Sequence, residues 1–134
     1  MSSSLIQVAN QSQQNVAIDS IISLGSVQRR FGCNCRLSGN GIEVSGAGYY
    51  VVDASITATP TAVGNVTVTM YENGVPYQGA TGTSSVSTEG NSTNISIVTT
   101  IRKGCCDNGA SNITFVLTEG AGIINNISAR VEKA

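Results

Sequence analysis

The feature that most constrains this fold is a regular series of turn signals that divides the chain into short runs rich in β-branched residues. From Val27 onward the turns fall at Gly39-Asn40-Gly41, Gly46-Ala47-Gly48, Asn73-Gly74, Glu89-Gly90-Asn91, Asp107-Asn108-Gly109 and Gly120-Ala121-Gly122. Short apolar runs between closely spaced turns indicate an all-β sandwich or barrel. No segment has a convincing helical period, and a length of 134 residues suits one domain with a real core.

Apolar and polar residues alternate most clearly between Gly48 and Thr59. Alternate residues of a strand share a face, so this pattern predicts one strand face in the core and one wetter face. The same pattern predicts strands at 65–72 and 75–81, joined by Asn73-Gly74 as a type I′ hairpin. The predicted core residues are Tyr50, Val52, Ala54, Ile56, Ala58, Val66, Val68, Met70, Ile95, Ile97, Ile101, Ile113, Phe115, Leu117, Ile127, Ala129 and Val131.

Residues 1–25 differ from the rest, because three short apolar runs are separated by polar stretches, including an amide-rich spacer at 10–15. Such runs cannot bury themselves, and the spacer favours an extended path. We therefore expect 1–25 to form an extended N-terminal arm with short strands, ahead of a β domain over 26–134. The arm should serve docking or exchange between protomers, through Leu5, Ile6 and Val8.

The net charge is −1, from seven Lys and Arg against eight Asp and Glu. This balance has no electrostatic footprint for nucleic acid or an anionic membrane, and we expect neither partner. The start of the chain lacks the pattern of a signal peptide, so synthesis in a cytosol is expected. Arg29 and Arg30, with Arg36 nearby, are the one local concentration of positive charge. On a strand the first two face opposite ways, and either ordinary hydrogen bonding or docking on an acidic partner explains them.

Four cysteines form a Cys-x-Cys pair and a vicinal pair, at Cys33, Cys35, Cys105 and Cys106. This is not the spacing of a zinc ribbon, so no metal site is expected. On a strand, Cys33 and Cys35 would share a face. Free thiols in a reducing cytosol are the favoured interpretation, and a disulfide remains the alternative.

The residues of a catalytic site are missing or scattered. Without histidine, neither a Ser-His-Asp triad nor a Cys-His pair can form. Carboxylates occur singly in strands or beside turns, as is ordinary for solvated surface groups, at Glu43, Asp53, Glu72 and Glu119. We therefore expect no enzyme, no cofactor and no catalytic residue.

Three segments together resemble the C1q/TNF-like jelly-roll family over about 42–131. Residues 48–52 resemble the family's Gly-x-Tyr entry into its central strand, 65–76 resemble the next strand and its Asn-Gly hairpin, and 102–104 precede another strand. The resemblance implies an antiparallel jelly-roll β-sandwich over 26–134 and a compact homotrimer. A low aromatic content of 4% suits such a trimer, because protomers would gain stability by burying flat apolar strand faces against each other.

The chain departs from the family in having an N-terminal segment and neither a collagen-like stalk nor a secretion signal. This combination is most similar to a phage capsid decoration protein, located on the capsid surface and made in the host cytoplasm. Its expected partners are the major capsid protein or another virion protein. The alternative is a fibre head or bacterial surface adhesin that binds a receptor or glycan.

Overall fold

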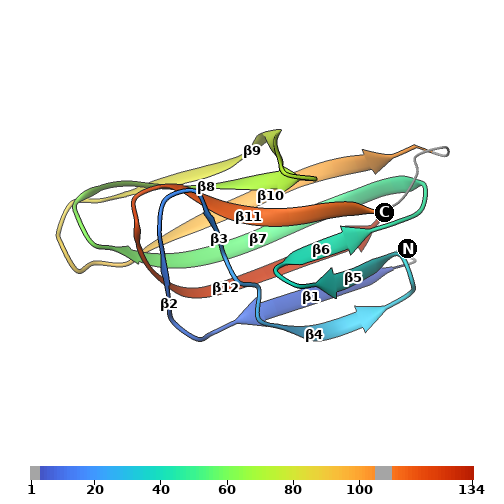
Figure 1. The fold of residues 1–134 in the computed structure, drawn as a ribbon, viewed down its shortest axis with the longest axis horizontal. Coiled ribbons are helices and arrows are strands. Elements are labelled where there is room, and N and C mark those ends of the chain that lie inside the picture. Colours follow the sequence, from blue (N-terminus) through green and yellow to red (C-terminus); the bar gives the residue numbers. More distant parts are fainter. Residues whose placement is uncertain (1–3, 105–109) are drawn as a thin grey trace.

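The computed structural model describes residues 4–104 and 110–134, which form strands and no helix (Figure 1). None of these residues therefore belongs to a helix that could cross a membrane. The strands are β1 (Leu5–Asn10), β2 (Gln14–Val16), β3 (Ser20–Ile21), β4 (Ser26–Phe31), β5 (Cys35–Ser38), β6 (Gly41–Val44), β7 (Gly48–Pro60), β8 (Gly64–Glu72), β9 (Val75–Val86), β10 (Thr93–Lys103), β11 (Ser111–Glu119) and β12 (Gly122–Lys133).

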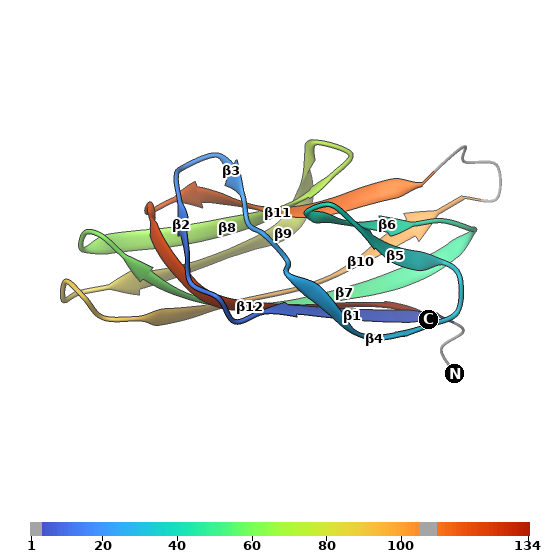
Figure 2. The ribbon, with the colours of Figure 1, turned by 60° about the horizontal axis from the view of Figure 1, so that its bottom comes forward.

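The strands form two six-stranded antiparallel sheets that pack face to face as two layers (Figure 2). Sheet A has the order β10-β7-β12-β1-β4, and β2 also pairs with β12. Sheet B has the order β5-β6-β11-β8-β9, and β3 also pairs with β11. Strands distant in sequence lie side by side in both layers, as in a jelly roll. The expected all-β jelly-roll sandwich is confirmed.

The core lies between the two sheets and consists of the predicted alternating residues. On β7, Tyr50, Val52 and Ile56 are fully buried, while the intervening Asp53 and Ser55 lie on the outer face. The residues predicted on β8, β10, β11 and β12 are all at most 3% exposed. On β7, β10 and β12 the apolar and polar side chains are thus divided between core and surface, which is the arrangement expected for period-two patterns.

The β8–β9 connection confirms the predicted hairpin. Glu72 pairs with Val75, so Asn73 and Gly74 are the two loop residues. Their φ angles are 54° and 80°, the positive values that a type I′ turn requires at both positions. Strand β9 continues to Val86, beyond the predicted end at 81.

The N-terminal segment contains the expected short strands, but it is not separate from the sandwich. Strand β1 lies inside sheet A, where Ile6 pairs with Val131 of β12 on one side and with Arg30 of β4 on the other. Both Ile6 and Val8 are completely buried. Their apolar side chains fill a place between the sheets, which explains why the segment does not extend away as an arm.

Candidate functional site

The residues predicted to dock lie in β1 and β4, at one edge of sheet A. Ile6 and Val8 face the core, so their side chains cannot contact a partner while the protein is folded. This corrects the expectation for these two residues. Leu5 is half-buried and points to the outer face of sheet A, opposite Phe31 of β4.

Arg29 and Arg30 point to opposite sides of β4, in agreement with strand alternation. Arg30 pairs with the inward-facing Ile6, and its Nε donates a 2.9 Å hydrogen bond to the backbone oxygen of Cys35. Arg29 pairs with Gln7 on the outer face. Neither side chain of this second pair forms a hydrogen bond or ion pair within the described chain. Arg29 is therefore a free cation on an open surface.

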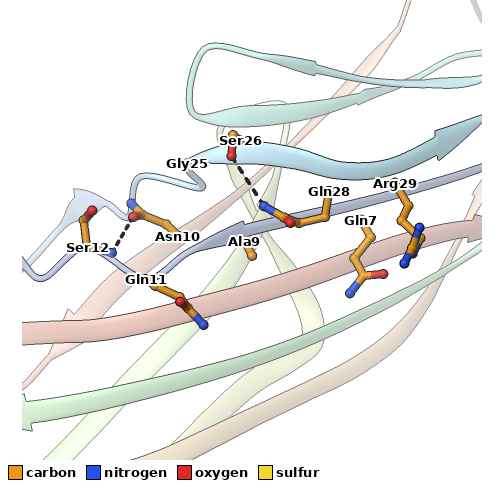
Figure 3. A pocket seen from close by; sticks show the side chains of 9 residues that line it. All are labelled: Gln7, Ala9, Asn10, Gln11, Ser12, Gly25, Ser26, Gln28 and Arg29. Carbon is orange, nitrogen blue, oxygen red and sulfur yellow. Dashed lines mark hydrogen bonds between the residues drawn. The ribbon is translucent and has the colours of Figure 1, made fainter.

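A polar groove of about 690 Å³ lies beside Arg29 and is lined by residues of β1, of the connection after it and of β4 (Figure 3). Amide and hydroxyl side chains dominate its walls, and Arg29 is the charged residue among them. The lining residues are Gln7, Ala9, Asn10, Gln11, Ser12, Gly25, Ser26, Gln28 and Arg29. In Figure 3 the side chains of Gln7 and Arg29 extend to the same side of the two strands. The groove offers many hydrogen-bond donors and acceptors to a polar ligand, and no aromatic anchor.

Hydrogen bonds hold one wall of the groove in place. Asn10 accepts a bond of 3.0 Å from the backbone nitrogen of Ser12 and donates one of 3.2 Å to the oxygen of Ser23. Gln14 forms a reciprocal pair with the same backbone, donating over 3.1 Å to the oxygen of Ser23 and accepting over 3.0 Å from its nitrogen. By contrast, Gln7 and Gln11 have no hydrogen-bond partner in the described residues. The groove thus combines a fixed wall with free amide groups.

Gly25 permits the close approach of the segment before β4 to the end of β1. Its φ is +75°, and a β-carbon there would lie 2.4 Å from the backbone oxygen of Ala9. Any side chain would meet backbone atoms in a left-handed conformation that L residues adopt only at a cost. Glycine is therefore required at this position of the groove lining.

The outer face of sheet A continues the polar surface away from the groove. One row across its strands contains, in order, Arg29, Gln7, Arg130, Asp53 and Val98. Arg130 and Asp53 are half-exposed and their nearest charged atoms lie 3.7 Å apart. Such an exposed pair contributes at most about 1 kcal/mol to stability. A smaller cavity of about 260 Å³ lies over this pair and also includes Gln7.

Toward one end of the same face, apolar side chains are exposed among the polar ones. Val98 and Tyr49 are 66% and 57% exposed, and Phe31 is 49% exposed. The half-buried Leu5 and Val51 share a row with Phe31, because strand pairing places Phe31, Leu5, Glu132, Val51 and Thr100 side by side. Tyr49 lies in the next row on one side of it and Val98 in the next row on the other. We name this set, Leu5, Phe31, Tyr49, Val51 and Val98, the apolar end of sheet A.

The outer face of sheet B is covered by hydroxyl groups that bond to one another. Thr67 and Thr83 are joined by a 3.0 Å bond, and Thr67 also donates to Glu119 over 3.0 Å. Thr69 lies 3.3 Å from the hydroxyl of Thr81 in the next register position. The outer face of sheet B therefore does not present the flat apolar surface that was expected between protomers.

The carboxylates considered for catalysis do not converge. Glu43 pairs with Arg36 at 2.6 Å in β6 and β5, whereas Asp53 lies on the outer face of sheet A and Glu119 at the end of β11. In the part of the chain that the structure describes, no three His, Cys, Asp or Glu side chains form a potential metal site. These carboxylates act as surface ion-pair and hydrogen-bond partners.

Cys33 and Cys35 are both free thiols, but they do not share a face. Cys33 is exposed in the β4–β5 connection, where Gly32 has a φ of 78°, whereas Cys35 begins β5 and is buried. The turn interrupts the strand on which the shared face had been predicted. Burial raises the pKa of the Cys35 thiol to about 11, against the smaller opposing effect of Arg30. Cys105 and Cys106 lie outside the described residues.

A polar network beneath this turn connects both ends of the chain to the sandwich. Ser4 Oγ donates a 2.6 Å bond to Asn34, and the Asn34 amide donates over 2.8 Å to the backbone oxygen of Ser45. The buried Tyr50 hydroxyl lies 2.8 Å from the same oxygen. The nitrogen of Lys133 donates to the oxygen of Ser4 over 2.9 Å. These groups satisfy one another, which indicates a structural role.

No family model and no curated protein matches the sequence. Solved structures do resemble the fold over nearly the whole chain. The Eiger TNF structure from S. frugiperda has a TM-score of 0.74 at 8% identity, covering 98% of this chain and 91% of that chain. The globular domain of zebrafish complement 1qA protein has a TM-score of 0.69 at 5% identity, covering 94% of each chain. PRD1 vertex protein P5 has a TM-score of 0.59 at 13% identity, covering 99% of this chain and 98% of that chain. At these identities the comparison establishes the fold, a C1q/TNF-like jelly roll.

Proposed function

We propose that this chain is a non-enzymatic structural virion protein, a homotrimeric decoration protein that binds and stabilises the capsid surface of a bacteriophage. The observation that carries the proposal is the full-length similarity to PRD1 vertex protein P5, which spans 99% of this chain. The scattered carboxylates and the absence of histidine support a role in assembly and binding. Synthesis in the host cytoplasm suits the free thiols Cys33 and Cys35.

Mass spectrometry of purified particles, with copy numbers, tests the virion role. A copy number comparable to that of the major capsid protein supports decoration. A handful of copies would instead indicate a tail fibre. Absence from the particle would refute both virion roles.

We place the trimer surface on the apolar end of sheet A. Val98 and Tyr49 are more than half exposed on this face, and exposed apolar side chains favour burial against another protomer. The outer face of sheet B is a poorer candidate, because its hydroxyl groups already bond to one another. Three copies around a closed axis would bury this surface without leaving an open end.

A pair of matched substitutions tests this placement. Val98→Asp should yield a monomer, because a carboxylate in an apolar interface loses its hydration without gaining a partner. Val75→Asp is the control, since Val75 is 63% exposed at the β8–β9 hairpin, outside sheet A. Light scattering should show three chains for the wild type and for the control. A wild-type monomer at micromolar concentration, or a trimeric Val98→Asp variant, would contradict the proposal.

The capsid contact is proposed at the β4 edge, through Arg29 and Arg30, whereas Leu5 belongs to the proposed trimer surface. Arg29 is available on the outer face and is free of any neutralising carboxylate in the described chain. Binding to bare particles should weaken with added salt, because exposed charges are screened over about 10 Å at 0.1 M ionic strength.

One observation favours the second candidate, a receptor- or glycan-binding role. The groove beside Arg29 is lined by amides and hydroxyls, which can hydrogen-bond to a saccharide. A glycan array with wild type and Gln11→Ala tests it. Selective binding that the substitution removes would support this role, and no binding to any glycan would count against it.

A further inference from the structure

The two edges of sheet A differ in how far the rest of the molecule covers them. At the β10 edge, Tyr77 of β9 donates a 2.8 Å hydrogen bond to the backbone of Thr100, and a β-carbon at Gly82 would lie 2.5 Å from Ile95. Strand β9 therefore packs closely over that edge. At the opposite edge, all six residues of β4 are exposed. A strand in this position presents unpaired backbone N–H and C=O groups to solvent.

The charges on β4 determine which strand can pair with it. Neither Arg29 nor Arg30 belongs to the ion pairs of the described chain, which join Arg36 to Glu43 and Arg130 to Asp53. Two copies of β4 placed edge to edge would bring four arginines together, and such like-charge contacts are unfavourable. The register shift within the β1–β4 pairing also discourages a long symmetric ladder. The edge thus rejects a second copy of itself and favours a strand that carries carboxylates.

The groove adds polar partners beside the same strand. Arg29 lines it together with Gln7 and Gln11, whose amides have no hydrogen-bond partner among the described residues (Figure 3). A carboxylate paired with Arg29 would therefore lie near further donors. The groove contains no large apolar side chain to anchor a folded hydrophobic surface. These features favour a polar, extended segment over a globular apolar partner.

We propose that β4 is a strand-addition site for an extended acidic segment of another protein. The segment would pair its backbone with the open edge of β4 and direct carboxylates toward Arg29 and Arg30. The identification of this partner as a virion protein rests on the proposed function, whereas the chemistry of the site does not.

Peptides based on β4 itself provide matched probes. One has the sequence of residues 26–31 with Arg29→Glu and Arg30→Glu, and its control has the native sequence. Fluorescence anisotropy at low salt should show the acidic peptide binding the full protein at least about tenfold more tightly, because two cross-strand charge pairs change from repulsive to attractive. Equal affinities, or no binding of the acidic peptide, would overturn the proposal.

Single substitutions in the protein locate the site. Arg29→Ala should weaken binding of the acidic peptide several-fold, by roughly the contribution of one cross-strand charge pair. The control is Arg102→Ala, which removes an exposed arginine from the covered edge of the same sheet and should leave the affinity unchanged. Equal losses from the two substitutions would show that the attraction is not localised at β4.

Backbone methylation separates strand addition from simple charge attraction. Two acidic peptides are N-methylated at alternate residues, one on each edge of the strand. Since only one edge can pair with β4, one methylated peptide should bind like the parent and the other should lose binding. Equal binding by both would overturn strand addition.

Particle binding by the variant Arg29→Glu/Arg30→Glu distinguishes this inference from the proposed function. The inference predicts that the variant no longer binds bare particles. If it still binds, the inference fails while the virion role stands. If the wild type binds the acidic peptide but is absent from particles, the virion role fails and β4 remains a strand-addition site for a different partner.

Discussion

Replacing Ile6 by alanine tests whether the N-terminal segment is an integral part of the sandwich. The Ile6 side chain is completely buried between Val131 and Arg30 of the neighbouring strands. The change to alanine removes three carbon atoms, which corresponds to about 2.4 kcal/mol of transfer free energy at about 0.8 kcal/mol for each buried group. The cavity left behind adds to this loss, so we expect the free energy of unfolding to fall by about 2–5 kcal/mol.

Leu5→Ala is the matched control on the same strand. Leu5 is only half-buried and faces away from the core, so truncation should cost less than about 1.5 kcal/mol. Urea denaturation at one fixed protomer concentration measures both values, because oligomerisation makes apparent stability depend on concentration. If Ile6→Ala changes the free energy of unfolding by less than about 0.5 kcal/mol, as is usual for surface positions, β1 is not a core strand in solution.

Two further perturbations test the packing near β4 and β5. Cys35→Ala should reduce the decrease in the free energy of unfolding at alkaline pH. The reason is that the pKa of this thiol is about 11 in the folded protein, against 9.0 for an unperturbed thiol. Its contribution is therefore complete below about pH 8 and declines as the unfolded thiol ionises, by about 2 kcal/mol between about pH 8 and about pH 10.5. Identical pH profiles for wild type and variant, in urea denaturation at each pH, would refute this. Gly25→Ala should destabilise the protein by more than about 2 kcal/mol, because strain and the contact with Ala9 act together. Gly90→Ala is the control, because Gly90 has a φ of +89° but open space around it, and this substitution should cost about 1–2 kcal/mol. Thermal denaturation compares the two variants, and equal destabilisation would contradict the argument from the contact with Ala9.

The core and the central hairpin could be predicted because their signals are local. A strand with period-two alternation must place its apolar residues on one face, whichever neighbours it later acquires. Residues 50–58 show this directly, since their alternate apolar side chains are all buried. The Asn73-Gly74 turn is equally local, because both residues tolerate the positive φ that a two-residue hairpin requires.

The role of the N-terminal segment could not be predicted from its own residues. Its short apolar runs are compatible either with a docking arm or with a strand in the sheet. The pairing of β1 with β12 decides between them, and β12 is formed by the opposite end of the chain. The error for Cys33 and Cys35 has a similar origin, since the turn at 32–34 removed the strand on which a shared face depended.

The groove also depends on contacts between segments that are separate in the sequence. Its walls come from β1, the connection after it and the start of β4, and the Asn10 and Gln14 bonds to Ser23 hold them together. Glutamine and asparagine in such stretches are ordinary loop residues by sequence. No local pattern distinguishes the anchored Asn10 from the free Gln11, so the candidate site became visible only in the folded chain.

Arg29 and Arg30 illustrate both a property that follows from the sequence and one that depends on tertiary contacts. The sequence by itself determined that these neighbours point to opposite sides of a strand, because successive side chains alternate. Only the tertiary structure decided their different roles. The approach of β5 supplies the Cys35 oxygen that binds Arg30, while the outer face of sheet A leaves Arg29 without a partner in the described chain. Alternation is a property of a single strand, whereas a hydrogen-bond partner is supplied by whichever strand the fold brings beside it.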